Sequence, residues 1–194
     1  MKRMEMYGKP FEENFGWSNG FIPEMKRIIG PHLLEPASIQ QDREEATDLI
    51  ILNARDKRIA CRVRRAKYWP DFRGQFTLRS KGKSGGPSEL TKVIDGEGDW
   101  MFYGFARADD ATEFVEWYLI DLPKFRSGML RKLWCKVFSD SNARLPCDYP
   151  PMVNWDGTEF FAFNVNQFPD DLLVASHIPD ETMKLPFVEE YASQ

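Results

Sequence analysis

The sequence predicts an α+β fold in which a mixed central β-sheet is flanked by helices. Apolar patterns occur along the chain in the order helix, strand, strand, strand, helix, strand. That order is typical of helices packed on one sheet. The 194 residues are 42% hydrophobic and 14% aromatic, which suits one domain, or one domain with an appendage, and argues against disorder.

The first part of the chain supplies a helix and two strands. Residues 1–20 are rich in aromatic residues and glycine without a clear period, so we expect an irregular lead-in. IPEMKRII at 22–29 has helical spacing and ends at a Gly-Pro pair. Residues 47–52 form a continuous apolar strand, NARDK at 53–57 is typical of a hairpin turn, and residues 58–65 form the partner strand.

The second part continues with a third strand, a capped helix and further strands. Ser88 can cap a helix over 89–94, which Gly96 ends. The remaining expected elements are strands at 75–80, 100–106, 113–122, 158–165 and within 170–177, a helix from Pro123 to about Trp134, and a long loop at 139–157. We therefore expect a lead-in at 1–20, a core domain at 21–138, and a C-terminal extension at 139–194 that packs on the core.

Several classes of protein are excluded by composition. No apolar run approaches the ~20 residues that a membrane span needs, and the N-terminus lacks the apolar region of a secretory signal. Three widely spaced cysteines and two histidines, His32 and His177, do not form a zinc motif. We expect an intracellular, cytoplasmic protein with reduced thiols.

Positive charge is concentrated in one part of an acidic chain. The net charge is −4, but the segment 55–83 holds eleven basic residues against Asp56 and Asp71, so it carries +9 and the remainder −13. Such a block indicates a polyanion site, or else a solvated basic face that balances an acidic neighbour. The residues expected to contact nucleic acid are Arg64, Arg65, Lys67, Arg79, Lys81 and Lys83.

Two further features lie in or next to this block. Tyr68 and Trp69 could stack on bases or fill the core, and we favour the core. Glu89 and Lys92 share a helical face, as a surface pair or as part of a site.

The strand pair carries a resemblance. Asp48 opens the first strand, and Arg62 lies on the second, where alternation places Arg62 and Arg64 on one face. This arrangement resembles the PD-(D/E)XK nuclease superfamily, and the order of elements matches its core over roughly residues 20–106. The resemblance implies a restriction-endonuclease-like core with a C-terminal strand extension, and a hydrolase that cleaves DNA with Mg²⁺.

The sequence departs from the family motif in its second half. The (D/E)-x-K positions, an acid and a lysine two residues later, fall at Ala60-Cys61-Arg62. Alanine cannot bind metal, and arginine stays protonated, so Arg62 could stabilise charge but not act as a base. In the catalytic interpretation, Asp48 and a relocated acid hold the metal. Glu44 is the first choice, Glu24 the second, and Glu89 is also available. In the alternative interpretation the site is silent, and the arginines only neutralise the acids at 42–48.

A second resemblance covers more of the chain. EEATDLIIL, RIACRVRR, FTLRS and SELTKVIDGEGDWMFYGF resemble a group of phage and prophage proteins without an assigned activity. It implies action inside a host cell. We expect a nucleic-acid-binding protein, with DNA as its partner and a Mg²⁺-dependent deoxyribonuclease as its enzymatic form. The alternative is an inactive nuclease-like phage protein that binds a host protein in counter-defence or recombination. We also expect Asp48 and Arg62 to face each other across adjacent antiparallel strands.

Overall fold

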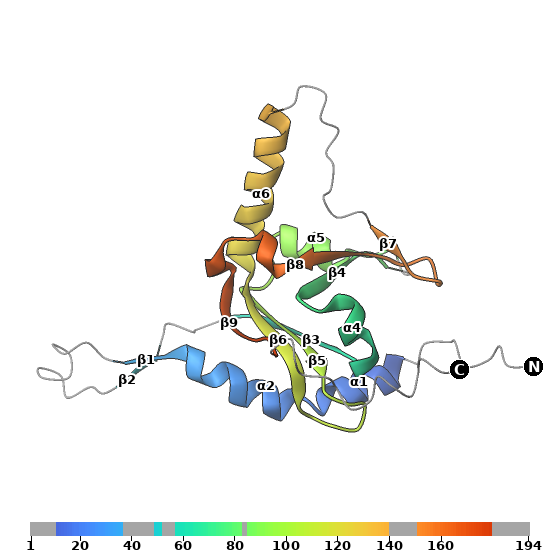
Figure 1. The fold of residues 1–194 in the computed structure, drawn as a ribbon, viewed down its shortest axis with the longest axis vertical. Coiled ribbons are helices and arrows are strands. Elements are labelled where there is room, and N and C mark those ends of the chain that lie inside the picture. The colour runs from blue at the N-terminus through green and yellow to red at the C-terminus, as the bar shows by residue number, and fades with distance from the viewer. Residues whose placement is uncertain (1–10, 37–48, 52–56, 83–84, 140–150, 180–194) are drawn as a thin grey trace, which may run out of the picture.

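The structure is a computed structural model that describes residues 11–36, 49–51, 57–82, 85–139 and 151–179. It confirms an α+β fold with a mixed sheet and flanking helices (Figure 1). The main sheet has four strands in the order β3-β5-β6-β9. β3 pairs with β5 in parallel, and the other two pairs are antiparallel. The strands of this sheet are β3 (Ile59–Arg64), β5 (Trp100–Ala106), β6 (Phe114–Asp121) and β9 (Leu173–His177).

Two smaller sheets accompany the main one. Three antiparallel strands lie in the order β4-β8-β7, and they are β4 (Gln75–Lys81), β8 (Glu159–Asn164) and β7 (Met152–Val153). A two-stranded antiparallel ribbon joins β1 (Leu34–Pro36) to β2 (Leu49–Ile51). The strands that follow residue 139 therefore belong to both the main sheet and the three-stranded sheet.

The described helices and 3₁₀ turns connect and cover these strands. Ser88 begins α5 by accepting a hydrogen bond from Thr91 N, and Gly96 follows the helix with φ +91°, as the sequence predicts. The α-helices are α1 (Phe11–Asn19), α2 (Ile22–Ile29), α4 (Trp69–Phe72), α5 (Glu89–Ile94) and α6 (Leu122–Ser139). Short 3₁₀ turns are η1 (Gly30–Leu33), η2 (Ala66–Tyr68), η3 (Val165–Gln167) and η4 (Asp170–Leu172).

The main sheet separates two hydrophobic clusters. On one face, Phe21 and the buried side of α2 pack against Trp100, Phe102 and Leu119. On the other face, the alternate residues of β5 and β6 pack against the three-stranded sheet and the start of α6. Figure 1 shows α1 and α2 along one side of the main sheet, with α5, α6 and β4-β8-β7 on the other. The chain thus forms a helical layer, a central sheet, and a mixed outer layer.

Several local expectations differ from the structure. Residues 11–19 form a helix within the expected irregular lead-in, and the helix after Pro123 extends to Ser139. The expected hairpin is wrong, because β2 pairs with β1 and β3 pairs with β5. The expectation of one central sheet is also wrong, because β4 belongs to the separate three-stranded sheet. β5 is buried along its whole length, so it needs sheet partners on both sides, and β3 takes one of those places.

Within the described ranges, no helix is long and apolar enough to cross a membrane.

Candidate functional site

Strand β3 presents a basic face to the outer layer. Its register places Arg62 beside Tyr103 and Arg64 beside Phe105, both of which belong to the cluster between the sheets. Ile59 and Val63 instead pack into the cluster beneath α2. The prediction that Arg62 and Arg64 share one face is therefore confirmed, and that face looks away from α2.

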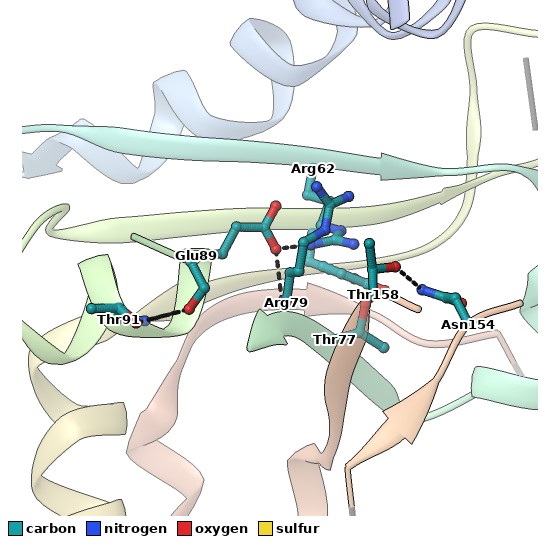
Figure 2. A network of polar contacts seen from close by, with 9 residues as sticks. Arg62, Thr77, Arg79, Glu89, Thr91, Asn154 and Thr158 are labelled. Carbon is teal, nitrogen blue, oxygen red and sulfur yellow. Dashed lines mark hydrogen bonds and ion pairs between the residues drawn. The ribbon is translucent and has the colours of Figure 1, made fainter. Parts of the chain in front are cut away.

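Glu89 connects β3 to β4 from the first turn of α5. Its Oε2 forms an ion pair with Arg62 Nη1 and accepts a hydrogen bond of 3.0 Å from Arg79 N (Figure 2). The Arg62 side chain is only 18% exposed, whereas that of Glu89 is 43% exposed. A mostly buried guanidinium is thus neutralised by a carboxylate that still reaches solvent. We name Arg62, Arg79, Glu89 and Lys92 the Glu89 cluster.

The cluster keeps an excess of positive charge. Lys92 lies one turn beyond Glu89 on α5, is exposed, and has no ion pair within the described part of the chain. The Arg79 side chain is likewise without a partner among the described residues, since only its backbone amide contacts Glu89. Of the three cations in the cluster, Arg62 is paired with Glu89, and the side chains of Arg79 and Lys92 remain available to an anion.

A cleft of about 340 Å³ lies beside this cluster. Residues 58–62 of the chain line it in an unbroken run, opposite the α5 side chains of Glu89, Lys92 and Val93. Its apolar walls include Leu78, Met101 and Leu122. The arrangement combines a charged rim with an apolar floor, which is the usual composition of a ligand site.

Arg64 occupies an aromatic setting next to the cluster. Its guanidinium carbon lies 4.5 Å from the centre of the Tyr68 ring and 5.8 Å from that of Phe72. Burial is the main cause that lowers the pKa of Arg64, and the nearby charge of Arg62 acts in the same direction. Its buried Nε has no hydrogen-bond partner among the residues that the structure describes. Arg64 is therefore held mainly by ring faces, and it is largely removed from solvent.

Several other basic residues are occupied by protein partners. Arg65 pairs with Asp109 at 3.1 Å and its side chain is 12% exposed, while Lys81 pairs with Glu159 at 3.0 Å. Lys67 is exposed, with its ammonium 5.1 Å from the centre of the Tyr68 ring. Lys83 lies outside the described residues. Among the six expected contacts, Arg64, Lys67 and Arg79 have no carboxylate partner within the described part of the chain, and of these Arg64 is buried against aromatic rings.

The acids proposed for catalysis are distributed differently from the expectation. Glu24 lies on α2 and pairs with Arg27, whose hydrogen bond lowers the pKa of Glu24. Because α2 covers the other face of the main sheet, Glu24 and Arg62 are not neighbours. Asp48 and Glu44 lie outside the described residues. The antiparallel strand pairing expected to bring Asp48 to Arg62 is wrong, because β2 pairs with β1 and β3 pairs with β5. The carboxylate that the structure brings to Arg62 is Glu89.

A buried carboxylate that the sequence analysis missed lies between the two sheets. Glu116 is 0% exposed and accepts hydrogen bonds from Trp69 Nε1 at 2.7 Å, Gly74 N at 2.8 Å and the Tyr118 hydroxyl. Burial, and then this hydrogen bond, raises the pKa of Tyr118. The sequence contained a signal for this burial. Glu116 lies two and four positions before Tyr118 and Ile120, which point into the core, so alternation along the strand places Glu116 on the same face. Trp69 is buried, as we favoured, while Tyr68 is 36% exposed.

The β7–β8 turn near the Glu89 cluster is structural. Asp156 Oδ1 accepts hydrogen bonds from the amide and hydroxyl of Thr158, and Gly157 takes φ +77°. Asn154 Nδ2 donates to Thr158 Oγ1 at 2.8 Å (Figure 2). The described residues contain no group of three or more His, Cys, Asp or Glu side chains placed to hold a metal ion.

Comparison of the chain with protein-family models, with curated proteins and with solved structures found no match.

Proposed function

We propose that the protein binds nucleic acid through the Glu89 cluster, on a restriction-endonuclease-like core related to the PD-(D/E)XK superfamily. The observation that carries the proposal is the gathering of Arg62, Arg79 and Lys92 around one carboxylate beside a cleft. The free side chains of Arg79 and Lys92 suit phosphate oxygens, which account for most protein contacts to nucleic acid. Lys67 and the part-exposed Tyr68 ring add a second point of contact along the same chain segment.

Binding without hydrolysis is the form of this proposal that the local chemistry favours. Ala60 stands where the family motif has its second carboxylate, and it lines the cleft with Arg62. Arg62 is already neutralised by Glu89, so it is not poised to stabilise a developing charge. These two features support a nuclease-like core that has kept a binding surface.

A hydrolytic form of the proposal would need Asp48 and a relocated acid to hold Mg²⁺. Glu44 remains one proposed ligand. Glu89 is a stronger candidate than Glu24, because Glu89 contacts Arg62 whereas Glu24 lies on the opposite face of the sheet. The corresponding test is DNA cleavage with Mg²⁺ or Mn²⁺ by the native protein, Asp48→Asn and Glu89→Gln. Cleavage that survives both substitutions would contradict this form.

The test of binding compares the salt dependence of DNA affinity between charge-reversal variants. Arg79→Glu combined with Lys92→Glu should lower affinity at least about tenfold at low salt and flatten the slope of log affinity against log salt by about 0.9 per lost phosphate contact. The matched control is Lys26→Glu, which changes an exposed lysine on α2 across the sheet. Equal losses in the double variant and the control, or no binding by the native protein at low salt, would refute the proposal.

A second candidate function is recognition of a protein partner by a catalytically silent core. The observation that favours it is the pairing of Arg62, Arg65 and Lys81 with carboxylates, which lowers the positive charge available to DNA. A phage factor that acts on a host protein would fit this surface. Salt-insensitive binding of a protein, with no binding of DNA, would select this candidate.

A further inference from the structure

The outer edge of β3 is open. β3 is the first strand in the order β3-β5-β6-β9, so among the described strands it has a sheet neighbour on one side only. The carbonyl of Arg58 accepts hydrogen bonds from Asp99 N at 2.9 Å and Trp100 N at 3.2 Å, so residue 58 points its backbone toward β5. Because alternate residues of a strand point to opposite edges, Ile59, Cys61 and Val63 direct their N–H and C=O groups away from β5.

These outward groups have no backbone partner among the described residues. The one contact they make is weak, a thiol of Cys61 placed 3.9 Å from the Ile59 carbonyl. The cleft runs beside this edge, since residues 58–62 line it consecutively. An unpaired strand edge next to a cleft is the geometry that accepts an added strand.

The side chains of β3 define what that added strand would contain. Ile59 and Val63 lie on the α2 side of the sheet, and Arg62 and Arg64 lie on the other. The cleft is lined by three cations, Arg58, Arg62 and Lys92, and by two carboxylates, Glu89 and Glu97. Side chains opposite one another on paired strands interact directly, so the complement alternates apolar with acidic residues.

We propose that the open edge of β3 binds an extended peptide segment in which β-branched apolar residues alternate with acidic ones. The acidic residues face Arg62 and the exposed Lys92, while the apolar residues extend the surface of Ile59 and Val63. This interaction deepens the protein-binding candidate and does not depend on nucleic-acid binding.

A second copy of the chain is a poorer occupant. Arg58, Arg62 and Arg64 have the same strand parity, so antiparallel pairing of two β3 strands brings arginines together. A register centred on Cys61 sets Arg58 opposite Arg64, and one centred on Val63 sets Arg62 opposite Arg64. Like charges directly opposite each other destabilise a strand pair. The charge pattern of β3 therefore favours a different, acidic strand.

The test uses the full chain and a fluorescent, acetylated peptide of nine residues that alternates valine with glutamate. A peptide in which lysine replaces glutamate should bind at least about tenfold more weakly. Two further peptides carry a single N-methyl group, on the central valine or on the glutamate next to it. Only one of these nitrogens faces β3, so one peptide should lose about tenfold in affinity and the other should change by less than about twofold. Equal affinities for the valine–glutamate and valine–lysine peptides, or equal effects of the two N-methyl groups, would overturn the proposal.

Amide exchange supplies an independent readout. The amides of Ile59, Cys61 and Val63 should exchange at least about tenfold more slowly with the peptide bound, while those of Ala60 and Arg62 should not change. Cys61→Pro should abolish peptide binding, because its outward N–H is lost without breaking a bond to β5. Arg79→Glu should weaken DNA binding and leave peptide affinity unchanged, because Arg79 is not among the residues that line the cleft, so failure of the peptide proposal is distinguishable from failure of the nucleic-acid proposal. Peptide binding without slower exchange at these three amides would overturn the inference.

Discussion

Replacing Glu89 with glutamine should tighten DNA binding. The Glu89 carboxylate contacts Arg62 and the backbone of Arg79, so its negative charge lies inside the surface that we propose to meet phosphate. A phosphate about 6 Å from that charge is repelled by roughly 0.7 to 1.4 kcal/mol at effective dielectric constants of about 80 to 40. Removing the repulsion should therefore raise affinity by about three- to tenfold at low salt. Glutamine keeps an oxygen that can still accept from Arg62 and Arg79.

The assay is fluorescence anisotropy of a labelled DNA duplex titrated at low and at physiological salt. Asp110→Asn is the matched control, because it removes one exposed carboxylate from the turn between β5 and β6. Its effect should be smaller than that of Glu89→Gln, and both effects should diminish as salt increases. Weaker binding by Glu89→Gln would mean that the carboxylate itself contacts the ligand or a metal, and would refute the electrostatic reasoning.

Three further predictions concern the core that holds the site. Glu116→Ala leaves three buried donors without an acceptor, so the free energy of unfolding in urea should fall by about 3–6 kcal/mol, against about 1–3 kcal/mol for Glu116→Gln. Burial raises the pKa of Tyr118, so above pH ~10 only the unfolded chain loses this proton and stability should fall by up to about 1.4 kcal/mol per pH unit. Tyr118→Phe should remove that part of the alkaline slope. In Gly104→Ala the new Cβ would lie 2.6 Å from Phe114 Cδ1, and thermal unfolding should show a loss of about 1–3 kcal/mol.

Local sequence patterns predicted the positions of helices and strands well, but they did not predict which strands pair with each other. The helix at 22–29 and the strand at 100–106 have the predicted bounds, and Ser88 caps α5 as expected. Each depends on periodicity or on a short-range hydrogen bond. The hairpin was wrong because NARDK specifies a turn only when its flanking strands lack better partners. β5, forty positions beyond, offers β3 a fully buried neighbour.

The candidate site shows the same difference between what local patterns predict and what depends on long-range packing. Alternation along β3 was enough to place Arg62 and Arg64 on one face, because the strand period fixes direction without knowledge of the neighbours. The partner of Arg62 could not be selected from among the acids. Glu24 and Glu89 have similar local settings in sequence, on short amphipathic helices. Only the packing of α2 and α5 on opposite faces of the sheet distinguishes them.

The order in which the strands pair has a consequence for how the chain folds during synthesis. β4 cannot pair until β8 has been synthesised, and the paired residues of β8 lie about 80 to 90 positions further along the chain. β6 likewise waits for β9, which ends at His177. A nascent chain that has reached only residue 138 would leave β4 without a sheet partner and would expose one edge of β6 to other chains. We expect folding to be slow and to complete only when the last strand leaves the ribosome, with aggregation of truncated chains as its characteristic failure.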